Sequence, residues 1–151
     1  MYLRRVRHNW IGSQSNPRGK RHRWCTKYFM SVQRPHPIAI NLLQKSRLLA
    51  LEYSDGAKFE LSCEYLRVHS PSAEVRGHGP GQEVLQVGKE NVNIKDIEPM
   101  GHYAVRLVFD DGHESGIFTW DYLYDLGLHR GQYWQRYLAA LAAAGRTRAA
   151  P

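Results

Sequence analysis

Two short hairpins with the same order of elements constrain this chain more than any other feature of its sequence. In the first, residues 48–61 alternate apolar and polar side chains on both sides of Asp55-Gly56. An Asp-Gly pair between two alternating runs is typical of a β-hairpin, because glycine accepts the positive φ that a tight turn requires. Ser62 then provides an N-cap for a short helical turn in which Tyr65 and Leu66 point inward.

Residues 105–124 repeat this order in a weaker form. Residues 107–112 align with residues 51–56, and residues 121–123 align with residues 64–66 after a one-residue slip. Two copies are too few for a solenoid, so we predict one domain in which two hairpins share a core. The alternative, a chance similarity between two ordinary hairpins, stays open at this point.

The same patterns predict the remaining elements. Residues 38–42, 83–88 and 92–97 are predicted strands, and residues 68–81 are a predicted loop because Gly, Pro and Ser are frequent there. A helix is predicted from Tyr133 to Ala144, with residues 126–131 as its connector. We therefore predict an α+β domain of mainly antiparallel β hairpins, in a small sheet or sandwich with two short helices and a C-terminal helix.

The positive charge of the chain is concentrated at its N-terminus. The formal net charge is +7, from 21 Lys and Arg against 14 Asp and Glu. Nine of the basic residues and none of the acidic ones lie in residues 1–34. We predict that residues 1–34 are a disordered basic tail, that residues 35–145 form a single domain and that residues 146–151 fray.

Three hypotheses for the tail stay open. In the first, Met30 is near the true start and the preceding residues are an over-extended reading frame. In the second, the tail is a basic arm that binds nucleic acid, and in the third it is passive. Because the rest of the chain is close to neutral, nucleic-acid binding is expected only through the tail.

The cysteine and apolar content favours a reducing compartment. Only two cysteines occur, Cys25 and Cys63, and they form neither a disulfide framework nor a CxxC metal pair. No apolar run approaches the roughly 18 residues that a membrane span needs. We predict a cytoplasmic protein without membrane contact.

Three stretches together resemble a known family: residues 65–74, 92–94 and 109–123. Over roughly residues 37–146 the chain resembles a domain of unknown function that occurs as small stand-alone bacterial proteins and as the N-terminal domain of γ-butyrobetaine hydroxylase and trimethyllysine hydroxylase. A similar module is appended to some Mrp-type iron-sulfur scaffold ATPases. The iron- and 2-oxoglutarate-binding domain of the hydroxylases has no counterpart in these 151 residues, so we expect no hydroxylase activity.

The resemblance also implies a structural zinc whose ligands this chain lacks. In the hydroxylase module three Cys and one His hold the zinc; the cysteine positions fall at Ser70, Ser72 and Val75, and the histidine falls at His113. Serine hydroxyls are poor zinc ligands, so we expect no metal and no other cofactor. The alternative is a different site for zinc or iron with N and O ligands, formed by His69, Glu74, His78 and His113.

Ligand binding is predicted on the loop after the first short helix, because polar side chains on a loop held by a rigid scaffold commonly bind ligands. The predicted binding residues are Arg67, His69, Ser70, Ser72, Glu74, Arg76 and His78. No nucleophile and base can be paired from the sequence. The resemblance implies an interaction role, so we predict a non-catalytic accessory module with a protein partner, a second copy being one candidate. The alternative is a metal-binding accessory protein linked to iron or iron-sulfur handling.

Overall fold

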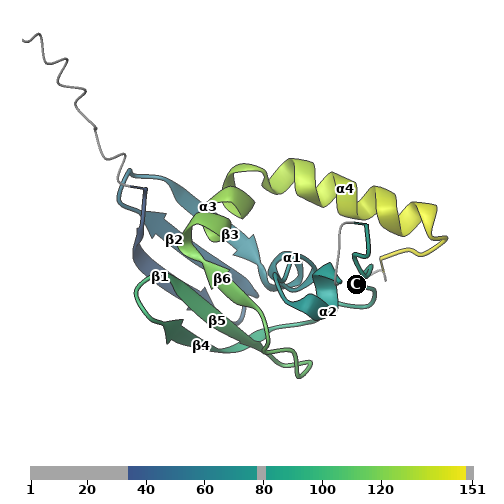
Figure 1. Ribbon diagram of the computed structural model, residues 1–151, viewed down its shortest axis with the longest axis horizontal. Coiled ribbons are helices and arrows are strands. Elements are labelled where there is room, and N and C mark those ends of the chain that lie inside the picture. Colours follow the sequence, from purple (N-terminus) through teal and green to yellow (C-terminus); the bar gives the residue numbers. More distant parts are fainter. Residues whose placement is uncertain (1–33, 78–80, 149–151) are drawn as a thin grey trace, which may run out of the picture. The chain divides into compact units, whose positions relative to one another are not determined.

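The computed structural model describes residues 34–77 and 81–148, and these form two antiparallel sheets of three strands each (Figure 1). The first sheet has the order β1-β2-β3, with β1 at Pro37–Leu43, β2 at Leu48–Tyr53 and β3 at Lys58–Ser62. The second has the order β4-β5-β6, with β4 at Ile94–Met100, β5 at Ala104–Phe109 and β6 at Ile117–Thr119. Each sheet is therefore a hairpin with one further strand on the side of its first strand.

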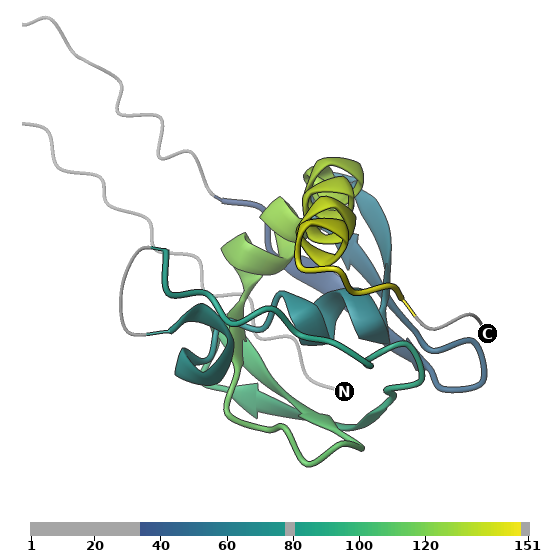
Figure 2. The ribbon, with the colours of Figure 1, turned by 90° about the vertical axis from the view of Figure 1, so that its right-hand side faces the viewer.

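Four helices accompany the sheets (Figures 1 and 2). They are α1 at Cys63–Val68, α2 at Ala73–Arg76, α3 at Trp120–Leu128 and α4 at Arg130–Ala143. The predicted α+β fold of antiparallel hairpins, short helices and a C-terminal helix is confirmed. None of the helices in residues 34–77 and 81–148 is long and apolar enough to cross a membrane.

The two hairpins match in geometry as well as in order, which confirms the predicted repeat. Their turns place Gly56 at φ 87° and Gly112 at φ 86°, the left-handed region that glycine tolerates. The helix after each hairpin begins in the same way, because the Ser62 and Thr119 hydroxyls each accept a hydrogen bond of 3.2 Å from the backbone N–H three residues later. Each cap satisfies a backbone donor that a first helical turn leaves without a partner.

Both sheets contribute to one apolar core. Alternate residues of β2 and β5 point into it, among them Leu51 and Tyr53 from β2 and Leu107 and Phe109 from β5. Leu66 of α1, Leu123 of α3 and Phe118 of β6 complete the same cluster and are inaccessible to solvent. Neither hairpin buries its apolar face alone, so the prediction that the two hairpins share a core is confirmed.

Helices α1 and α3 are joined by a reciprocal pair of tyrosine hydrogen bonds. The Tyr65 hydroxyl of α1 donates to the Leu126 carbonyl of α3 at 2.9 Å. The Tyr122 hydroxyl of α3 donates to the His69 carbonyl at the end of α1 at 2.7 Å. Tyr65 and Tyr122 are equivalent in the two repeats, and each satisfies a carbonyl that lies near a helix C-terminus and would otherwise lack a partner.

Two predicted elements are wrong. Residues 83–88 form no strand, because Val84 N–H donates to the carbonyl of Val75 and no neighbouring strand continues the pairing. Within the predicted loop 68–81, residues 73–76 form the helical turn α2, which the preceding serine introduces in an extended conformation. The alternation of residues 83–88 and the Gly, Pro and Ser content of residues 68–81 are local properties. Which hydrogen-bond partners these segments find is decided only by the surrounding structure.

The predicted connector at residues 126–131 is also wrong. Helix α3 continues through Gly127 to Leu128, and α4 starts at Arg130. A Cβ atom at Gly127 would lie 2.4 to 2.6 Å from the ring of Phe59. Glycine is needed at this position for close packing of α3 against β3 rather than for ending a helix.

Of the predicted tail, residues 1–33 lie outside the described residues, whereas Arg34 is described and forms an ion pair with Asp121. The domain boundaries stay predictions. Of residues 146–151, the structure describes 146–148. Arg148 forms a bidentate ion pair with Glu64, with Nε at 2.9 Å from Oε1 and a terminal nitrogen at 2.8 Å from Oε2. This pair connects the segment after α4 with α1.

We expect Gly127→Ala to destabilise the protein although alanine is the better helix former. The gain in helix propensity is at most about 1 kcal/mol, whereas overpacking against Phe59 costs about 1–3 kcal/mol. The matched control is Gly131→Ala in α4, where a Cβ atom meets nothing within 4 Å and a small gain is expected. Urea unfolding of both variants measures the difference, and equal stability changes would contradict the packing role of Gly127.

Candidate functional site

The loop after α1 is held to the second hairpin by a cluster of the buried Ser70, Ser72 and His113 and the exposed Glu74, here called the serine–histidine cluster. His113 Nε2 lies 2.8 Å from the Ser70 hydroxyl and 3.4 Å from the Ser72 hydroxyl. On the other side of the ring, Nδ1 lies 2.9 Å from a Glu74 carboxylate oxygen. Because a carboxylate only accepts, Nδ1 donates, and in the neutral ring Nε2 accepts from Ser70.

The structure brings together three of the four positions that, by the resemblance, correspond to the zinc ligands of the hydroxylase module. Ser70, Ser72 and His113 meet in the cluster, and Val75 is buried in α2. Zinc needs nitrogen or thiolate donors, and here one imidazole faces two hydroxyls. The residues present do not fit a zinc ion; they form a hydrogen-bonded connection instead.

The distances between Ser70, His113 and Glu74 resemble those of a Ser-His-acid triad, but a substrate cannot reach the Ser70 hydroxyl. A catalytic serine must present its oxygen to the carbonyl of a substrate. The Ser70 side chain is buried, with the residue only 1% exposed, and a Cβ atom placed on Gly116 would lie 2.2 Å from its Oγ. The backbone of Gly116 therefore covers the hydroxyl, which argues against Ser70 acting as a nucleophile.

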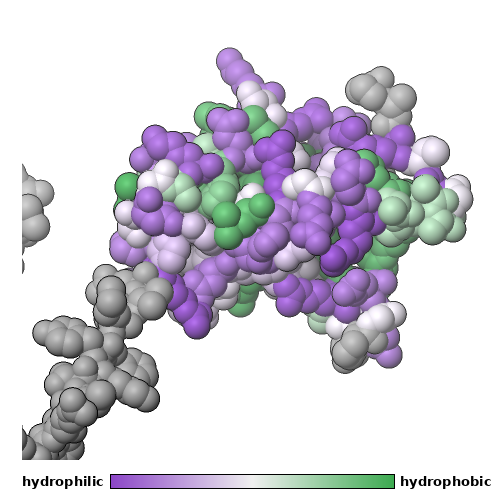
Figure 3. Space-filling model, turned by 90° about the horizontal axis from the view of Figure 1, so that it is seen from above, coloured by the Kyte–Doolittle hydropathy of each residue, from purple (hydrophilic) through white to green (hydrophobic). Residues whose placement is uncertain are grey.

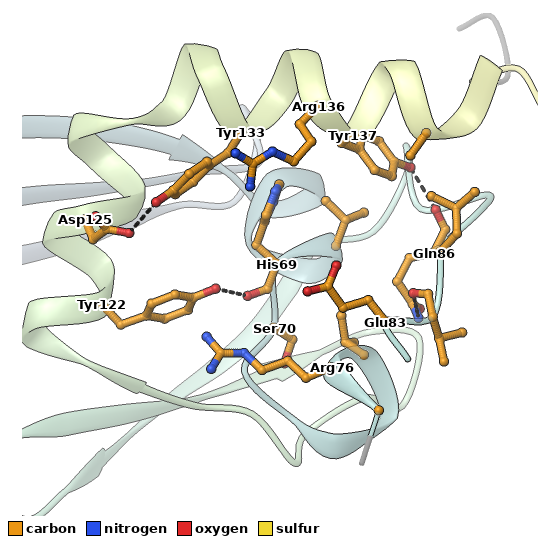
Figure 4. Close-up of a pocket in the computed structure, with 16 residues that line it drawn as sticks. His69, Ser70, Arg76, Glu83, Gln86, Tyr122, Asp125, Tyr133, Arg136 and Tyr137 are labelled. Carbon is orange, nitrogen blue, oxygen red and sulfur yellow. Dashed lines mark hydrogen bonds between the residues drawn. The ribbon is translucent and has the colours of Figure 1, made fainter. Parts of the chain in front are cut away.

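An open cavity of about 690 Å³ lies next to this cluster (Figure 4). In the close-up α4 runs along one side and presents Tyr133, Arg136 and Tyr137, while α3 contributes Tyr122 and Asp125. The remaining walls come from the ends of α1 and α2 and from residues 83–86. The volume lies within the range of roughly 300–1,000 Å³ that small-molecule and peptide side-chain sites occupy.

Two arginines of the cavity stack on tyrosine rings. The guanidinium carbon of Arg76 lies 4.8 Å from the centre of the Tyr122 ring, and that of Arg136 lies 5.6 Å from the centre of the Tyr133 ring. Both residues are exposed, and within residues 34–77 and 81–148 neither forms an ion pair with a carboxylate. Stacking restricts both guanidiniums, and Arg76 also interacts with the Tyr122 hydroxyl, so the N–H groups that remain without a protein partner can meet a ligand.

The acidic groups of the cavity differ in how they are engaged. Asp125 accepts a hydrogen bond of 2.8 Å from the Tyr133 hydroxyl and lies 2.9 Å from His129 Nδ1. Glu83 is exposed and points its carboxylate into the cavity (Figure 4). The two unpaired guanidiniums therefore outnumber the one carboxylate that no hydrogen bond engages.

The tyrosine hydroxyls at the cavity have backbone or carboxylate partners. Tyr122 donates to the His69 carbonyl, and Tyr137 donates to the Gln86 carbonyl at 2.9 Å. Burial raises the pKa of Tyr122 and raises that of Tyr137 to about 12, so both stay neutral donors at physiological pH. These bonds fix the positions of the aromatic walls.

His69 lies in the cavity wall as a neutral imidazole. Its Nδ1 lies 2.9 Å from the Tyr65 carbonyl, and its ring stacks at 6.1 Å from that of Tyr133. Burial lowers the pKa of His69, and the hydrogen bond to Tyr65 offsets this effect in part. The ring therefore adds apolar surface and no positive charge at neutral pH.

The residues predicted to bind ligands occupy three different environments. His69, Ser70 and Arg76 line the cavity, although the hydroxyl of Ser70 belongs to the serine–histidine cluster together with Ser72 and Glu74. Arg67 is buried; its Nε donates to Asp111 at 2.8 Å. His78 lies outside the described residues. A binding role for the whole set stays a prediction.

The alternative metal site receives no support from the arrangement of its described members. His69 contacts α1 and α4, whereas Glu74 and His113 belong to the serine–histidine cluster. In the part of the chain that the structure describes, no group of three or more His, Cys, Asp and Glu is placed to hold a metal ion.

The sequence reasoning missed the contribution of α3 and α4 to the cavity. Tyr133, Arg136 and Tyr137 have the i, i+3, i+4 spacing that places side chains on one helix face. An arginine on the same helix face as two tyrosines therefore indicates that this face is not wholly packed in the hydrophobic core. What it faces depends on how α4 lies over α1, which no local pattern specifies.

We expect the triple variant Ser70→Cys, Ser72→Cys, Val75→Cys to bind one zinc ion per chain. The structure already places positions 70 and 72 at His113, position 75 follows in α2, and thiolates supply the missing donors. Elemental analysis of protein purified without chelator or affinity metal measures the zinc content. Adding His113→Ala should weaken zinc binding at least about tenfold; equal binding with and without the histidine would contradict the arrangement.

We expect the protein to lose stability as the pH falls below about 6.5, in part through His69. Its pKa is lower in the folded chain than in the unfolded chain, so the unfolded chain binds the proton first and acid favours unfolding. One such proton contributes at most about 1.4 kcal/mol per pH unit. Urea unfolding at pH 7.5 and 5.0 should show a smaller loss for His69→Gln than for wild type. The control His102→Gln changes an exposed histidine and should lose as much unfolding free energy between the two pH values as the wild type does.

Comparisons with solved structures identify relatives that are similar to this chain. One protein with an NMR solution structure is 49% identical, with a TM-score of 0.67, over 78% of this chain and 88% of its own. A second NMR solution structure is 54% identical, with a TM-score of 0.66, over 76% of this chain and 90% of its own. A crystal structure of a protein of unknown function from Acidithiobacillus ferrooxidans, assigned to the DUF971 family, is 40% identical, with a TM-score of 0.52, over 61% of this chain and 92% of its own. A search of curated protein sequences found no match.

A comparison with protein families agrees with the resemblance seen in the sequence. Residues 40–124 match the family described as gamma-butyrobetaine hydroxylase-like, N-terminal. The match covers more than half of the chain and includes both hairpins and the residues of the serine–histidine cluster. This chain belongs to the gamma-butyrobetaine hydroxylase-like N-terminal domain family.

Proposed function

We propose that this protein is a non-catalytic module that binds another protein through the face that contains the cavity. The observation that carries the proposal is the pair of stacked, unpaired arginines, Arg76 and Arg136, in an aromatic cavity of about 690 Å³. Tyrosine and arginine are the residue types that contribute most to binding energy at protein interfaces. A partner side chain that enters such a cavity contacts rigid rings and oriented donors.

The rim of the cavity supports the same proposal. Val84 is 53% exposed at the edge of the cavity, on a segment that belongs to neither sheet. On the face viewed from the α4 side, hydrophilic residues predominate and apolar residues form small patches between them (Figure 3). This composition is typical of an interface whose partners also exist apart, because permanent dimers bury larger apolar areas.

Catalysis fits the same geometry less well. The Ser70 hydroxyl is covered by the backbone of Gly116, and His69 is held against the Tyr65 carbonyl in the cavity wall. A nucleophile and a base that both reach the cavity are therefore missing from the residues the structure describes. A positioned, hydrogen-bonded wall with oriented arginines serves binding without chemistry.

A photo-cross-linking residue, p-benzoylphenylalanine, at Val84 tests the proposal in cells that express the full chain. We expect an ultraviolet-dependent adduct of one discrete mass, which weakens when Arg136→Glu is added. The matched control places the same residue at Lys45, an exposed turn position that does not line the cavity, and should give no adduct. An adduct of twice the chain mass would identify a second copy as the partner. Absence of any adduct, or the same adducts from both positions, would refute the proposal.

A further inference from the structure

The cavity carries a charge pattern that specifies its ligand more closely than protein binding alone. Arg76 on α2 and Arg136 on α4 each stack on a tyrosine and have no carboxylate partner among the described residues. Each guanidinium is thus oriented in advance, so little side-chain entropy is lost when it binds an anion. Carboxylates and phosphates both match the planar N–H edge of a guanidinium, so the other walls of the cavity must distinguish between them.

The rest of the cavity suits an apolar or aromatic group. Val68 and Leu85 supply aliphatic surface, and the rings of Tyr122, Tyr133 and Tyr137 supply aromatic surface. Because the hydroxyls of these tyrosines already donate to protein acceptors, the rings present mainly their apolar faces and edges. A ligand that fills this space therefore combines a carboxylate with an apolar body.

A cationic ligand fits less well. One face each of Tyr122 and Tyr133 is already covered by a guanidinium, and Asp125 is engaged by Tyr133 and His129. Glu83 alone offers an unengaged carboxylate, against two arginines. Glu83 instead opposes an incoming anion, which predicts the sign of its effect on binding.

We infer that the cavity binds the C-terminal residue of a partner polypeptide, with the terminal carboxylate at one of the two arginines, which lie on different sides of the cavity (Figure 4), and an apolar side chain against the tyrosines. This inference rests on the proposed function and names its ligand class. A free N-acylated amino acid offers the same chemistry, so the experiment separates the two sources.

The test is a titration of the full chain, followed by isothermal titration calorimetry and by backbone amide NMR shifts. The probes are the peptide Gly-Ser-Gly-Ser-Phe with a free or an amidated C-terminus, and N-acetylphenylalanine with its amide. We expect the free-acid peptide to bind at least about tenfold more tightly than its amide, since a charged hydrogen bond of ordinary strength corresponds to this ratio. The peptide acid should also bind more tightly than N-acetylphenylalanine.

Variants give the residue assignment. At least one of the single variants Arg76→Gln and Arg136→Gln should bind the free-acid peptide at least about tenfold more weakly than wild type. The control Lys45→Gln makes the same charge change away from the cavity and should bind the peptide as wild type does. Glu83→Gln should strengthen binding severalfold, an effect that general loss of structure does not produce. Weaker binding in Glu83→Gln would show that the site selects a cation and would overturn the inference, as would unchanged binding in both arginine variants.

The outcomes separate this inference from the proposed function. If N-acetylphenylalanine binds and the peptide does not, the ligand is not the C-terminus of a polypeptide. This result would overturn the inference and would also count against protein binding at this face. If no probe binds but the discrete adduct at Val84 still forms, the ligand class is wrong and the protein-binding proposal stands.

Discussion

The reciprocal tyrosine bonds between α1 and α3 are the interaction on which the rest of the structure depends. Each hairpin ends in a capped helix, and each helix carries a tyrosine in its first turns that reaches a carbonyl near the C-terminal end of the other helix. Tyr65 and Tyr122 are buried over most of their length, so they fill the core between the two repeats while their hydroxyls satisfy helix ends. The bonds fix how one repeat lies on the other, and the cavity opens beside the bond from Tyr122 to His69.

The serine–histidine cluster shows how hydrogen bonds hold the loop after α1 in position. The loop between α1 and α2 is connected to the turn between β5 and β6 by bonds from His113 to Ser70, Ser72 and Glu74. Each such bond contributes about 1 kcal/mol in net terms, far less than a structural zinc, but removing a partner from a buried group costs more than the bond itself contributes. The cluster thus holds α2, and with it Arg76, at the cavity.

The cavity combines parts that no single element supplies. Helix α4 contributes an arginine and two tyrosines from one face, and α3 contributes Tyr122 together with the aspartate that Tyr133 contacts. Arg148 pairs with Glu64 and lies 5.8 Å from the ring centre of Trp134, which connects the segment after α4 with α1. Stacking restricts the arginines and hydrogen bonds fix the tyrosines, and for the proposed ligand such pre-positioned donors favour one anion geometry over general attraction of negative charge.

The sequence by itself determined both hairpins, the cap at Ser62 and the presence of a C-terminal helix, because turn chemistry, alternation and residue identity are local properties. It misplaced a strand at residues 83–88 and a helix end at Gly127, since a strand needs a partner and a glycine within a helix can serve close packing instead of termination. Of the residues predicted to bind, it could not separate Arg67, which is buried and pairs with Asp111, from Arg76, which has no carboxylate partner among the described residues. Only the tertiary structure decided which charges meet a partner and which face the cavity, because that depends on segments far apart in the chain.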